Sequence, residues 1–319
     1  MRGLVDQDIR PRERLLAGMD DRIDLEFGVA GEEDALIEAL AGIDVLVTSS
    51  RLPVGRRVLE ATELALVAKI GTGLDSVDLE AAAEEGVGVV HTPGLNAFSV
   101  AEHALSLLLA VNRNVLLGHR TLEAGGWRDT MPTGRHLVGG SVGIVGFGNV
   151  GSRLAGLLSG FHVDVRAYDP YVHRIDTEIT GAELSPLPEL LRGSDAVVVC
   201  AELTAESRGL IDAEALSTMP GDATLVNVSR GPIVDESALV AALEGDEIAG
   251  AGLDVFAEEP LPADSPLHGF DNVVLTPHLG ASTGASRGAT IDELAALVSA
   301  YAAGETLPDR FVAVPPDGD

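Results

Sequence analysis

Three residues with the chemistry to reduce a carbonyl group each follow a predicted strand in the second half of the chain. Arg230 comes after the run TLVNV, Glu259 after GLDVF, and His278 after VVLT. Ligands of open α/β sheets gather outside the carboxyl ends of the strands, so these side chains should share one sheet edge. A guanidinium can bind a carboxylate bidentately, an imidazolium can protonate a carbonyl, and a carboxylate can stabilise that imidazolium. Each residue alone could be structural, but together they suit reduction of a 2-oxo acid.

A glycine-rich loop points to a dinucleotide cofactor. Gly146, Gly148 and Gly151 form the pattern G-x-G-x-x-G directly after the apolar run SVGIV and directly before a helical pattern. The first glycine permits a tight turn, the second lets a pyrophosphate approach, and the third lets helix and strand pack closely. Asp169, at the end of the next strand, would bind ribose hydroxyls and repel a 2′-phosphate, which favours NAD over NADP. Arg174, nearby, leaves NADP open as the less favoured cofactor.

Several segments resemble those of one enzyme family. SVGIVGFGNVG, NVSRGPIVDE, GLDVFAEEP and TPHLGAST are similar to signature segments of the D-isomer-specific 2-hydroxyacid dehydrogenases. KIGTGLDSVDLEAA and HTPGLNAFSVAEHAL are similar to segments of that family's substrate domain. The resemblance covers most of the chain and implies an NAD-dependent oxidoreductase that interconverts a D-2-hydroxy acid and its 2-oxo acid by hydride transfer. It implies His278 as acid/base, Glu259 as the partner of that histidine and Arg230 as the substrate clamp.

The same resemblance implies binding residues. Those for the cofactor are Gly146, Gly148, Asn149, Val150, Gly151, Asp169, Ala201, Val228, Asp254 and Gly280. Those for the substrate are Lys69, Thr72, Gly73 and Arg230, with the backbone N–H groups of Thr72 and Gly73 receiving the substrate carboxylate. Phosphoglycerate dehydrogenases of this family often carry a basic residue at the position of Lys69, which leaves a phosphorylated substrate open. The alternative is a solvent-exposed lysine near a strand end. The stretch CAELT at 200–204 departs from the family pattern, which leaves the adenine and ribose contacts open.

Alternating β-branched runs and helical patterns predict an α/β fold of two Rossmann-like domains with parallel, doubly wound sheets. Strands are expected over 44–48, 66–70 and 87–91, and then over 142–146, 163–168, 196–200, 224–228, 249–254 and 273–276. The second series matches a complete dinucleotide-binding sheet. A helix expected over 283–303 follows that sheet and should return to the first domain. A discontinuous substrate-binding domain, residues 1–95 plus 284–319, would then flank an NAD-binding domain of residues 96–283.

The connection between the two series should contain a long helix and an arm. The helix is expected to begin near Asn96 or Ser99 and to end near Leu117, with Ser99 and Glu102 fitting a capping box. Residues 118–140 lack periodicity and predict an extended connection. Trp127 within it suits either a subunit contact or a packing anchor. The resemblance implies a homodimer.

The charge composition narrows the classes of partner. The chain has 50 acidic and 21 basic residues, for a formal net charge of −29, and Lys69 is its single lysine. Such a surface repels phosphate backbones, which disfavours nucleic acid and anionic membranes. Acid excess with lysine depletion resembles the cytosolic proteins of halophilic archaea, because concentrated salt screens the charge. A GC-rich genome with an unusually acidic protein is the alternative.

Other features bound the location and the class of function. Cys200 is the single cysteine, so no internal disulfide and no thiol cluster for a metal is expected. The charged N-terminus lacks the pattern of a signal peptide, and the longest apolar stretch is too short for a bilayer span, so a cytoplasmic protein is expected. The alternative function is a dinucleotide-sensing, corepressor-like binding protein on the same fold.

Overall fold

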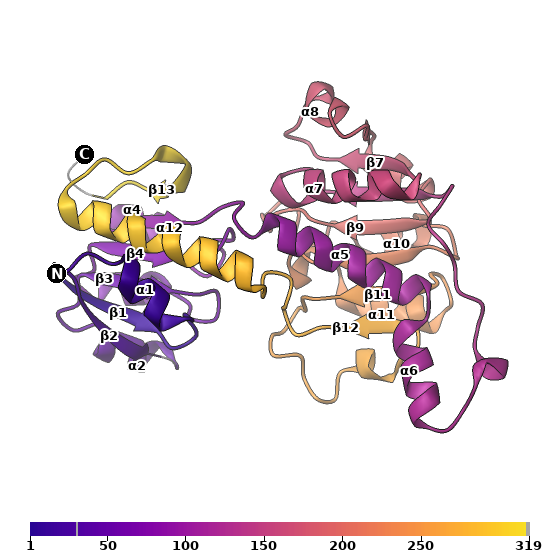
Figure 1. The fold of residues 1–319 in the computed structure, drawn as a ribbon, viewed down its shortest axis with the longest axis horizontal. Helices are drawn as coiled ribbons and strands as arrows, with labels where there is room; N and C mark the ends of the chain where they lie inside the picture. The colour runs from indigo at the N-terminus through magenta and orange to yellow at the C-terminus, as the bar shows by residue number, and fades with distance from the viewer. Residues whose placement is uncertain (30, 317–319) are drawn as a thin grey trace. The chain divides into compact units, whose positions relative to one another are not determined.

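The computed structural model describes residues 1–29 and 31–316. Their contacts divide the chain into two compact units. Unit 1 comprises Met1–Asn96 and the described residues from Ser282 onward, and unit 2 comprises Ala97–Ala281. The chain therefore leaves unit 1 once and returns to it once, as Figure 1 shows by colour. These boundaries lie one and two residues from those expected from the sequence.

Unit 1 is a six-stranded sheet with helices on both faces. The strand order is β13-β5-β4-β3-β1-β2, with β13 antiparallel to β5 and the other strands parallel. The strands are β1 (Arg2–Asp6), β2 (Asp24–Val29), β3 (Val45–Thr48), β4 (Leu66–Lys69), β5 (Gly88–His91) and β13 (Val312–Val314). The helices are α1 (Arg12–Gly18), α2 (Glu33–Ala39), α3 (Arg56–Glu60), α4 (Leu79–Glu84) and α12 (Gly284–Ala303).

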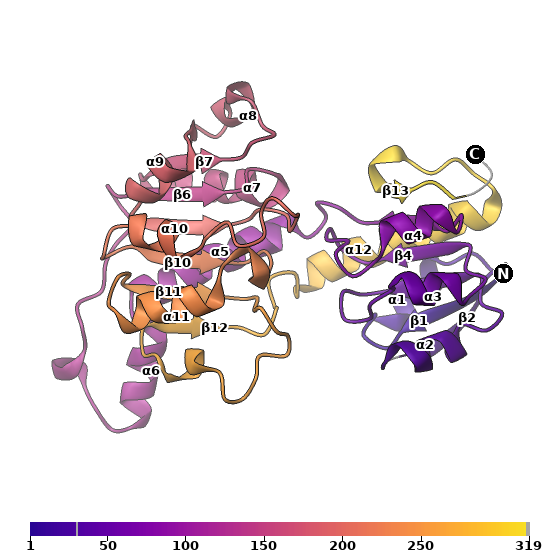
Figure 2. The ribbon, with the colours of Figure 1, turned by 180° about the vertical axis from the view of Figure 1, so that it is seen from behind.

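The alternation of strand side chains builds two apolar layers in unit 1. Leu46 packs with the buried residues of α2, α3 and α4, whereas Val45 and Val47 pack with those of α1 and α12. Strands buried on both faces are near-continuously apolar, as in parallel sheets generally. Figure 1 shows α1 and α12 over one face of the sheet, and Figure 2 shows α3 and α4 on the other side.

Unit 2 is a seven-stranded, fully parallel sheet of order β12-β11-β10-β9-β6-β7-β8. The strands are β6 (Ser141–Val145), β7 (Asp164–Tyr168), β8 (Glu183–Leu184), β9 (Ala196–Val199), β10 (Thr224–Asn227), β11 (Gly250–Leu253) and β12 (Val273–Leu275). One face is covered by α5 (Ala97–Asn112) and α7 (Asn149–Leu158). The other is covered by α9 (Leu187–Arg192), α10 (Ala213–Thr218) and α11 (Glu236–Glu244). The α/β, doubly wound prediction is confirmed.

The remaining helices lie at the periphery of the units. Unit 2 also contains α6 (Val115–Glu123) and α8 (Arg174–Glu178). Short 3₁₀ helices are η1 (Arg128–Thr130), η2 (Ser159–Phe161), η3 (Gly231–Ile233), η4 (Pro266–Gly269) and η5 (Asp309–Phe311). In the described part of the chain, no single helix is long and apolar enough to cross a membrane, and the bent pair α5 and α6 passes that test only when taken together.

The long connecting helix expected to reach Leu117 is instead two helices. Helix α5 ends at Asn112, α6 begins at Val115, and the two are bent by 58°. Asn114 between them has φ 50°, a left-handed conformation that asparagine tolerates better than most residues, and its Nδ2 donates to the carbonyl of Pro132 at 3.2 Å. The expected capping box is also wrong, because α5 begins at Ala97 and Ser99 lies inside its first turn. The extended arm is shorter than expected, since α6 continues to Glu123.

Candidate active site

Arg230, Glu259 and His278 lie in loops that leave the same edge of the unit 2 sheet. They follow β10, β11 and β12, which are sheet neighbours in register. Gly231 explains how closely two of these loops pack, because a Cβ there would collide with the backbone of Phe256. The loop that carries Arg230 therefore lies directly against the chain that leads from β11 to Glu259.

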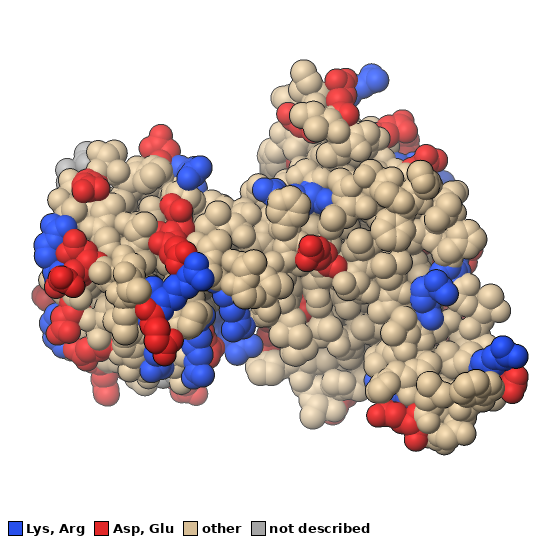
Figure 3. Space-filling view, in the orientation of Figure 1, with Lys and Arg blue, Asp and Glu red and all other residues tan. Residues whose placement is uncertain are grey.

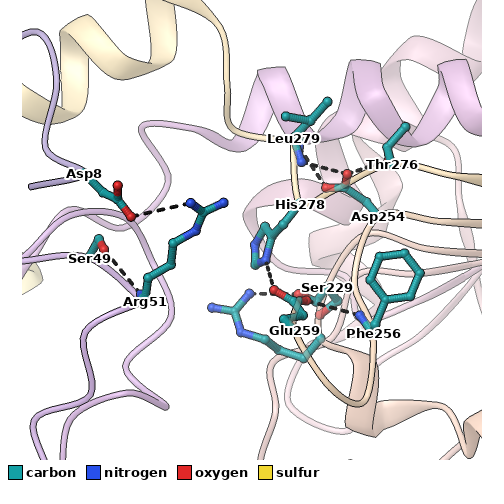
Figure 4. A network of polar contacts seen from close by, with 12 residues as sticks. Asp8, Ser49, Arg51, Ser229, Asp254, Phe256, Glu259, Thr276, His278 and Leu279 are labelled. Carbon is teal, nitrogen blue, oxygen red and sulfur yellow. Dashed lines mark hydrogen bonds and ion pairs between the residues drawn. The ribbon is translucent and has the colours of Figure 1, made fainter. Parts of the chain in front are cut away.

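The structure brings His278 and Glu259 into direct contact. His278 Nδ1 lies 2.8 Å from Glu259 Oε2, and Glu259 Oε1 accepts a hydrogen bond from the Phe256 N–H at 3.1 Å (Figure 4). Both carboxylate oxygens are thereby oriented. The two side chains remain 36% and 37% exposed, so a small molecule can reach the pair. A fixed carboxylate beside an accessible imidazole is the arrangement that general acid/base chemistry needs.

Glu259 is held in its ionised form despite its partial burial. Burial, the largest single influence, raises the pKa of this carboxyl group. The hydrogen bond and charge of His278, the Phe256 N–H and the charge of Arg230 together outweigh burial, so the pKa of Glu259 lies below its ordinary value. Arg230 is therefore electrostatically coupled to the pair. Its own Nη1 donates to the carbonyl of Ser229 at 2.8 Å, and its carbonyl accepts from Asn227 Nδ2 at 2.9 Å.

The glycine-rich loop has the shape that a pyrophosphate requires. Gly146 has φ 92°, and a Cβ there would collide with the backbone of Ala201. A Cβ at Gly151 would collide with the carbonyl of Gly146, so α7 packs tightly onto β6. By contrast, a Cβ at Gly148 would meet nothing within 4 Å. Gly148 is the N-cap of α7 and supplies no side chain to its first-turn N–H groups, which leaves them open to an anion.

The other residues implied for the cofactor surround this loop. Asn149 and Val150 are the first two residues of α7. Asp169 Oδ2 accepts from the Phe147 N–H at 2.8 Å, and Oδ1 accepts from the Tyr171 N–H at 2.9 Å, so Asp169 fastens the end of β7 to the glycine-rich loop. Val228 is buried directly after β10. The glycine cradle and the open helix N-terminus fit a dinucleotide.

Asp254 and Gly280 form part of a buried network directly behind His278. The Asp254 side chain is 2% exposed and accepts from Thr276 Oγ1 at 2.6 Å and from the N–H groups of Leu279 and Gly280, both at 2.8 Å. His103 Nε2 lies 3.0 Å from Asp254 Oδ1. Burial raises the pKa of Asp254, but these hydrogen bonds prevail and lower it below its ordinary value. Sequence reasoning missed His103 and Thr276, for which the only signal was their place in motif segments.

The residues implied for the substrate other than Arg230 lie in unit 1. Lys69, the last residue of β4, is 2% exposed, so the alternative of a solvent-exposed lysine is wrong. It is buried because β4 is an interior strand, and Lys69 is in register with Thr48 and His91 on either side. The loop that follows is ordered by Thr72, whose carbonyl accepts from His91 Nδ1 at 2.9 Å. Gly73 follows Thr72 in that loop.

Comparison with known proteins gives a consistent family. Residues 105–280 match the model of the D-isomer specific 2-hydroxyacid dehydrogenase, NAD binding domain. D-3-phosphoglycerate dehydrogenase from Mycobacterium tuberculosis is 40% identical over 295 residues, which are 92% of this chain and 56% of that protein. The chain thus spans about half the length of the phosphoglycerate dehydrogenases it matches. Glyoxylate reductase from Pyrococcus furiosus is 38% identical, covering 86% of this chain and 84% of that protein.

Solved structures have the same fold. A protein from Thermus thermophilus superimposes with a TM-score of 0.90 at 32% identity, covering 98% of this chain and 100% of that one. NAD-dependent formate dehydrogenase from Staphylococcus aureus, solved with NAD, gives a TM-score of 0.86 at 29% identity, covering 99% and 100%. Family match, relatives and fold agree. This chain belongs to the D-isomer-specific 2-hydroxyacid dehydrogenase family, and residues 105–280 form its NAD-binding domain.

Proposed function

We propose that this protein interconverts a D-2-hydroxy acid and its 2-oxo acid, with NAD as the cofactor. His278 is the acid/base, Glu259 is the partner of that histidine, and Arg230 binds the substrate. The observation that carries the proposal is the 2.8 Å contact between His278 Nδ1 and Glu259 Oε2 at the carboxyl edge of the sheet, with Arg230 coupled to it. Few other arrangements offer a proton donor, its counter-charge and a carboxylate-binding cation in one place.

The division of labour follows from the atoms available. Bound NADH supplies the hydride for the carbonyl carbon. Because Nδ1 of His278 is engaged by Glu259, its Nε2 is the atom that donates the proton to the carbonyl oxygen. Glu259 stabilises the cationic imidazole before that transfer. Arg230 binds the substrate carboxylate and orients the carbonyl, since a guanidinium offers paired donors in a fixed geometry.

Unit 1 is the substrate-binding domain in this proposal, and unit 2 holds the cofactor. The backbone N–H groups of Thr72 and Gly73 receive the substrate carboxylate. Lys69 supports a substrate with a second anionic group, because it places a basic side chain at the carboxyl end of β4. Asp169 supports NADH over NADPH, since its carboxylate lies against the glycine-rich loop, where a 2′-phosphate would meet its charge.

We also infer a cytoplasmic homodimer adapted to high salt. Helix α6 has no buried residue among those described, and Val115, Leu122 and Trp127 on it and after it are exposed. In Figure 3 few charged side chains lie over α5, whereas charged residues make up 22% of the chain. The exposed Trp127, close in sequence to the exposed Leu122 and Val115, supports a subunit contact. Light scattering in molar KCl tests it, and a monomeric mass would contradict it.

The function is tested by a panel of 2-oxo acids, including glyoxylate, pyruvate and a phosphorylated member, with NADH and with NADPH in molar KCl. The wild type should reduce at least one of them and prefer NADH. The His278→Gln variant should lose a factor on the order of 10²–10⁴ in kcat while binding NADH normally. His268→Gln is the matched control, because His268 lies in the same unit and its side chain forms a hydrogen bond with the carbonyl of Pro262. Full activity in His278→Gln would exclude His278 as the acid.

A further inference from the structure

A buried polar cluster lies behind the turn that carries His278. It consists of Asp254 after β11, Thr276 after β12 and His103 on α5, with side-chain exposures of 2% for Asp254 and 20% for His103. A carboxylate so buried is stable only when donors surround it. Here the donors come from two segments, the loop after β12 and helix α5, and the donor on α5, His103, has no part in the proposed chemistry.

Asp254 fastens the catalytic turn at three points. Its carboxylate accepts from the N–H groups of Leu279 and Gly280, both at 2.8 Å, and its own carbonyl accepts from the His278 N–H at 2.9 Å. Figure 4 shows Asp254 beside Leu279 and Thr276, with His278 turned toward Glu259. Three consecutive backbone N–H groups of the turn therefore point at one residue.

This fastening opposes a strained backbone. His278 has φ 52°, in the left-handed region, where a residue with a Cβ is disfavoured by about 1 kcal/mol or more. Such a conformation persists only when the surroundings determine it. It matters for the chemistry, because it sets the direction in which the imidazole leaves the chain and so its 2.8 Å contact with Glu259.

His103 in turn holds Asp254. Thr276 Oγ1 donates its single hydrogen to Asp254 Oδ1 at 2.6 Å, so it can only accept from His103 Nε2, which lies 2.9 Å away. The ring of His103 therefore carries a hydrogen on Nε2 and directs it at both Thr276 Oγ1 and Asp254 Oδ1. Helix α5, which bears His103, packs against β10, β11 and β12 through buried apolar residues, so it is a rigid support.

We propose that His103 is a positioning residue for the reaction. Through Asp254 it keeps residues 278–280 in the strained conformation that aims His278 at Glu259. This inference rests on the proposed function, and it concerns a side chain that never touches the substrate. Removing the Nε2 donor leaves the buried carboxylate underpaired, so Asp254 is expected to shift, the turn to relax and the His278–Glu259 contact to loosen.

Three substitutions separate donation from packing. His103→Gln places an amide nitrogen about as far from the backbone as Nε2 and keeps the donor. His103→Asn carries the same amide one bond nearer the backbone and cannot reach Asp254. His103→Leu removes the donor altogether. Ser106→Ala is the control on the same helix, because Ser106 is exposed and bonds only to the carbonyl of Glu102 among the described residues.

The first measurement is the NMR signal of the hydrogen-bonded Nδ1–H of His278 in the protein without substrate, identified by its loss in His278→Gln. It should persist in the wild type, His103→Gln and Ser106→Ala, and be lost or broadened in His103→Asn and His103→Leu. The second is kcat for 2-oxo acid reduction. It should fall on the order of 10–100-fold in the Asn and Leu variants and stay within about threefold in the Gln variant.

The two measurements keep the proposals apart. An unchanged Nδ1–H signal in both the Asn and the Leu variants would overturn the positioning role, whatever their activity. Should the Leu variant not fold, the Asn variant alone decides, since it keeps a polar side chain in the same place. If the wild type reduces no 2-oxo acid, the proposed function fails, while the signal still reports whether His103 holds the turn.

Discussion

At the scale of single residues, each reactive side chain of the candidate site is oriented by a neighbour on its non-reacting side. Glu259 takes the Phe256 N–H on one oxygen and His278 on the other. His278 is directed by Asp254, which binds three N–H groups of its turn. These orienting contacts fix the positions of Glu259 and His278 before the substrate binds, and small errors in those positions lower the reaction rate strongly.

The charge of Glu259 should set the upper pH limit of reduction. Because its folded-state pKa is lowered, Glu259 is ionised throughout the neutral range and stabilises the cationic form of His278. Glu259→Gln keeps a similar shape without the charge, so the imidazolium should lose its proton more readily. The alkaline fall in kcat/KM should move down by roughly one pH unit, with activity retained at acidic pH.

The pH profile of reduction for wild type, Glu259→Gln and Glu258→Gln checks this expectation. Glu258 is the adjacent, exposed carboxylate and serves as the matched control. If the profile shifts in Glu258→Gln and not in Glu259→Gln, the partner of His278 has been misidentified.

Asp254 should contribute to stability in a pH-dependent way. Its folded-state pKa lies below the ordinary value of 3.8, so the ionised form stabilises the fold above that pH, and the contribution disappears as pH falls through the lowered folded-state pKa. In Asp254→Asn an NH2 group replaces the Oδ2 atom that accepts from the Gly280 N–H, so that hydrogen bond is lost. The free energy of unfolding should fall by about 1–3 kcal/mol. Denaturant unfolding should show this loss at about pH 6 and a smaller one at about pH 3. An equal loss at both would mean that the charge of Asp254 is not what matters.

The sequence predicted the motif residues of the candidate site, but not the residues that orient them. Glu259 and His278 could be paired because strand ends converge on one sheet edge, a property of topology. His103 was missed although it stands in the segment HTPGLNAFSVAEHAL, because its spacing on an apolar helix is that of any core histidine. The burial of Lys69 was likewise hidden, since a lysine at a strand end is ordinarily exposed and only the position of β4 between β3 and β5 encloses it.

At the scale of elements, two glycines between β6 and α7 have different roles: Gly151 permits close packing, and Gly148 leaves open space. Gly151→Ala should disturb the packing of α7 on β6, because its Cβ would collide with the Gly146 carbonyl. Gly148→Ala should fold normally, since its Cβ meets no protein atom within 4 Å, yet it fills the space before the open N–H groups of α7. We expect NADH affinity to fall in both variants and the melting temperature to fall only in Gly151→Ala.

Gly156→Ala on the same helix is the control for these glycines. Its Cβ also meets nothing within 4 Å, and the residue lies in the helix interior, so the substitution should stabilise by about 0.5–1 kcal/mol with NADH affinity unchanged. Titration of NADH fluorescence and thermal unfolding measure both quantities. Unchanged NADH affinity in Gly148→Ala would show that the cofactor does not approach this residue.

Strands with strong apolar runs were predictable, and those without them were not. All six strands expected in the second series are present within a residue or two. Four strands were missed. β8 has two residues, β13 has three, and β2 alternates charged with apolar residues because one face is exposed. β1 is buried, but its apolar run is only three residues long and is flanked by Arg2 and Asp6. The break at Asn114 was also missed: polar residues 112–114 interrupt the apolar run there, but apolar residues resume at Val115, and the left-handed backbone angle of Asn114 is what marks the bend.

At the scale of the whole molecule, the net charge of −29 should make the stability of the fold depend on salt. Lowering the ionic strength from about 1 M to about 0.1 M lengthens the Debye screening length from ~3 Å to ~10 Å, so charges interact over longer distances. Self-repulsion among the carboxylates of the folded chain should then grow, and the melting temperature should fall. Thermal unfolding across a KCl series, repeated with NaCl as a control for ion identity, measures the effect. A melting temperature independent of salt would contradict it.

Because the chain leaves unit 1 after Asn96 and returns to it at Ser282, the two units are completed at different times during synthesis. Unit 2 is one continuous segment, so its core is complete once Ala281 has emerged from the ribosome. Unit 1 begins first and finishes last, because one face of its sheet is covered by Ile291, Leu294 and Val298 of α12. Until these residues emerge, that apolar face of Val5, Val47 and Leu66 has no permanent cover. A nascent chain of this protein therefore carries an incomplete unit 1 sheet while all of unit 2 is synthesised, until α12 covers its apolar face and β13 pairs with β5.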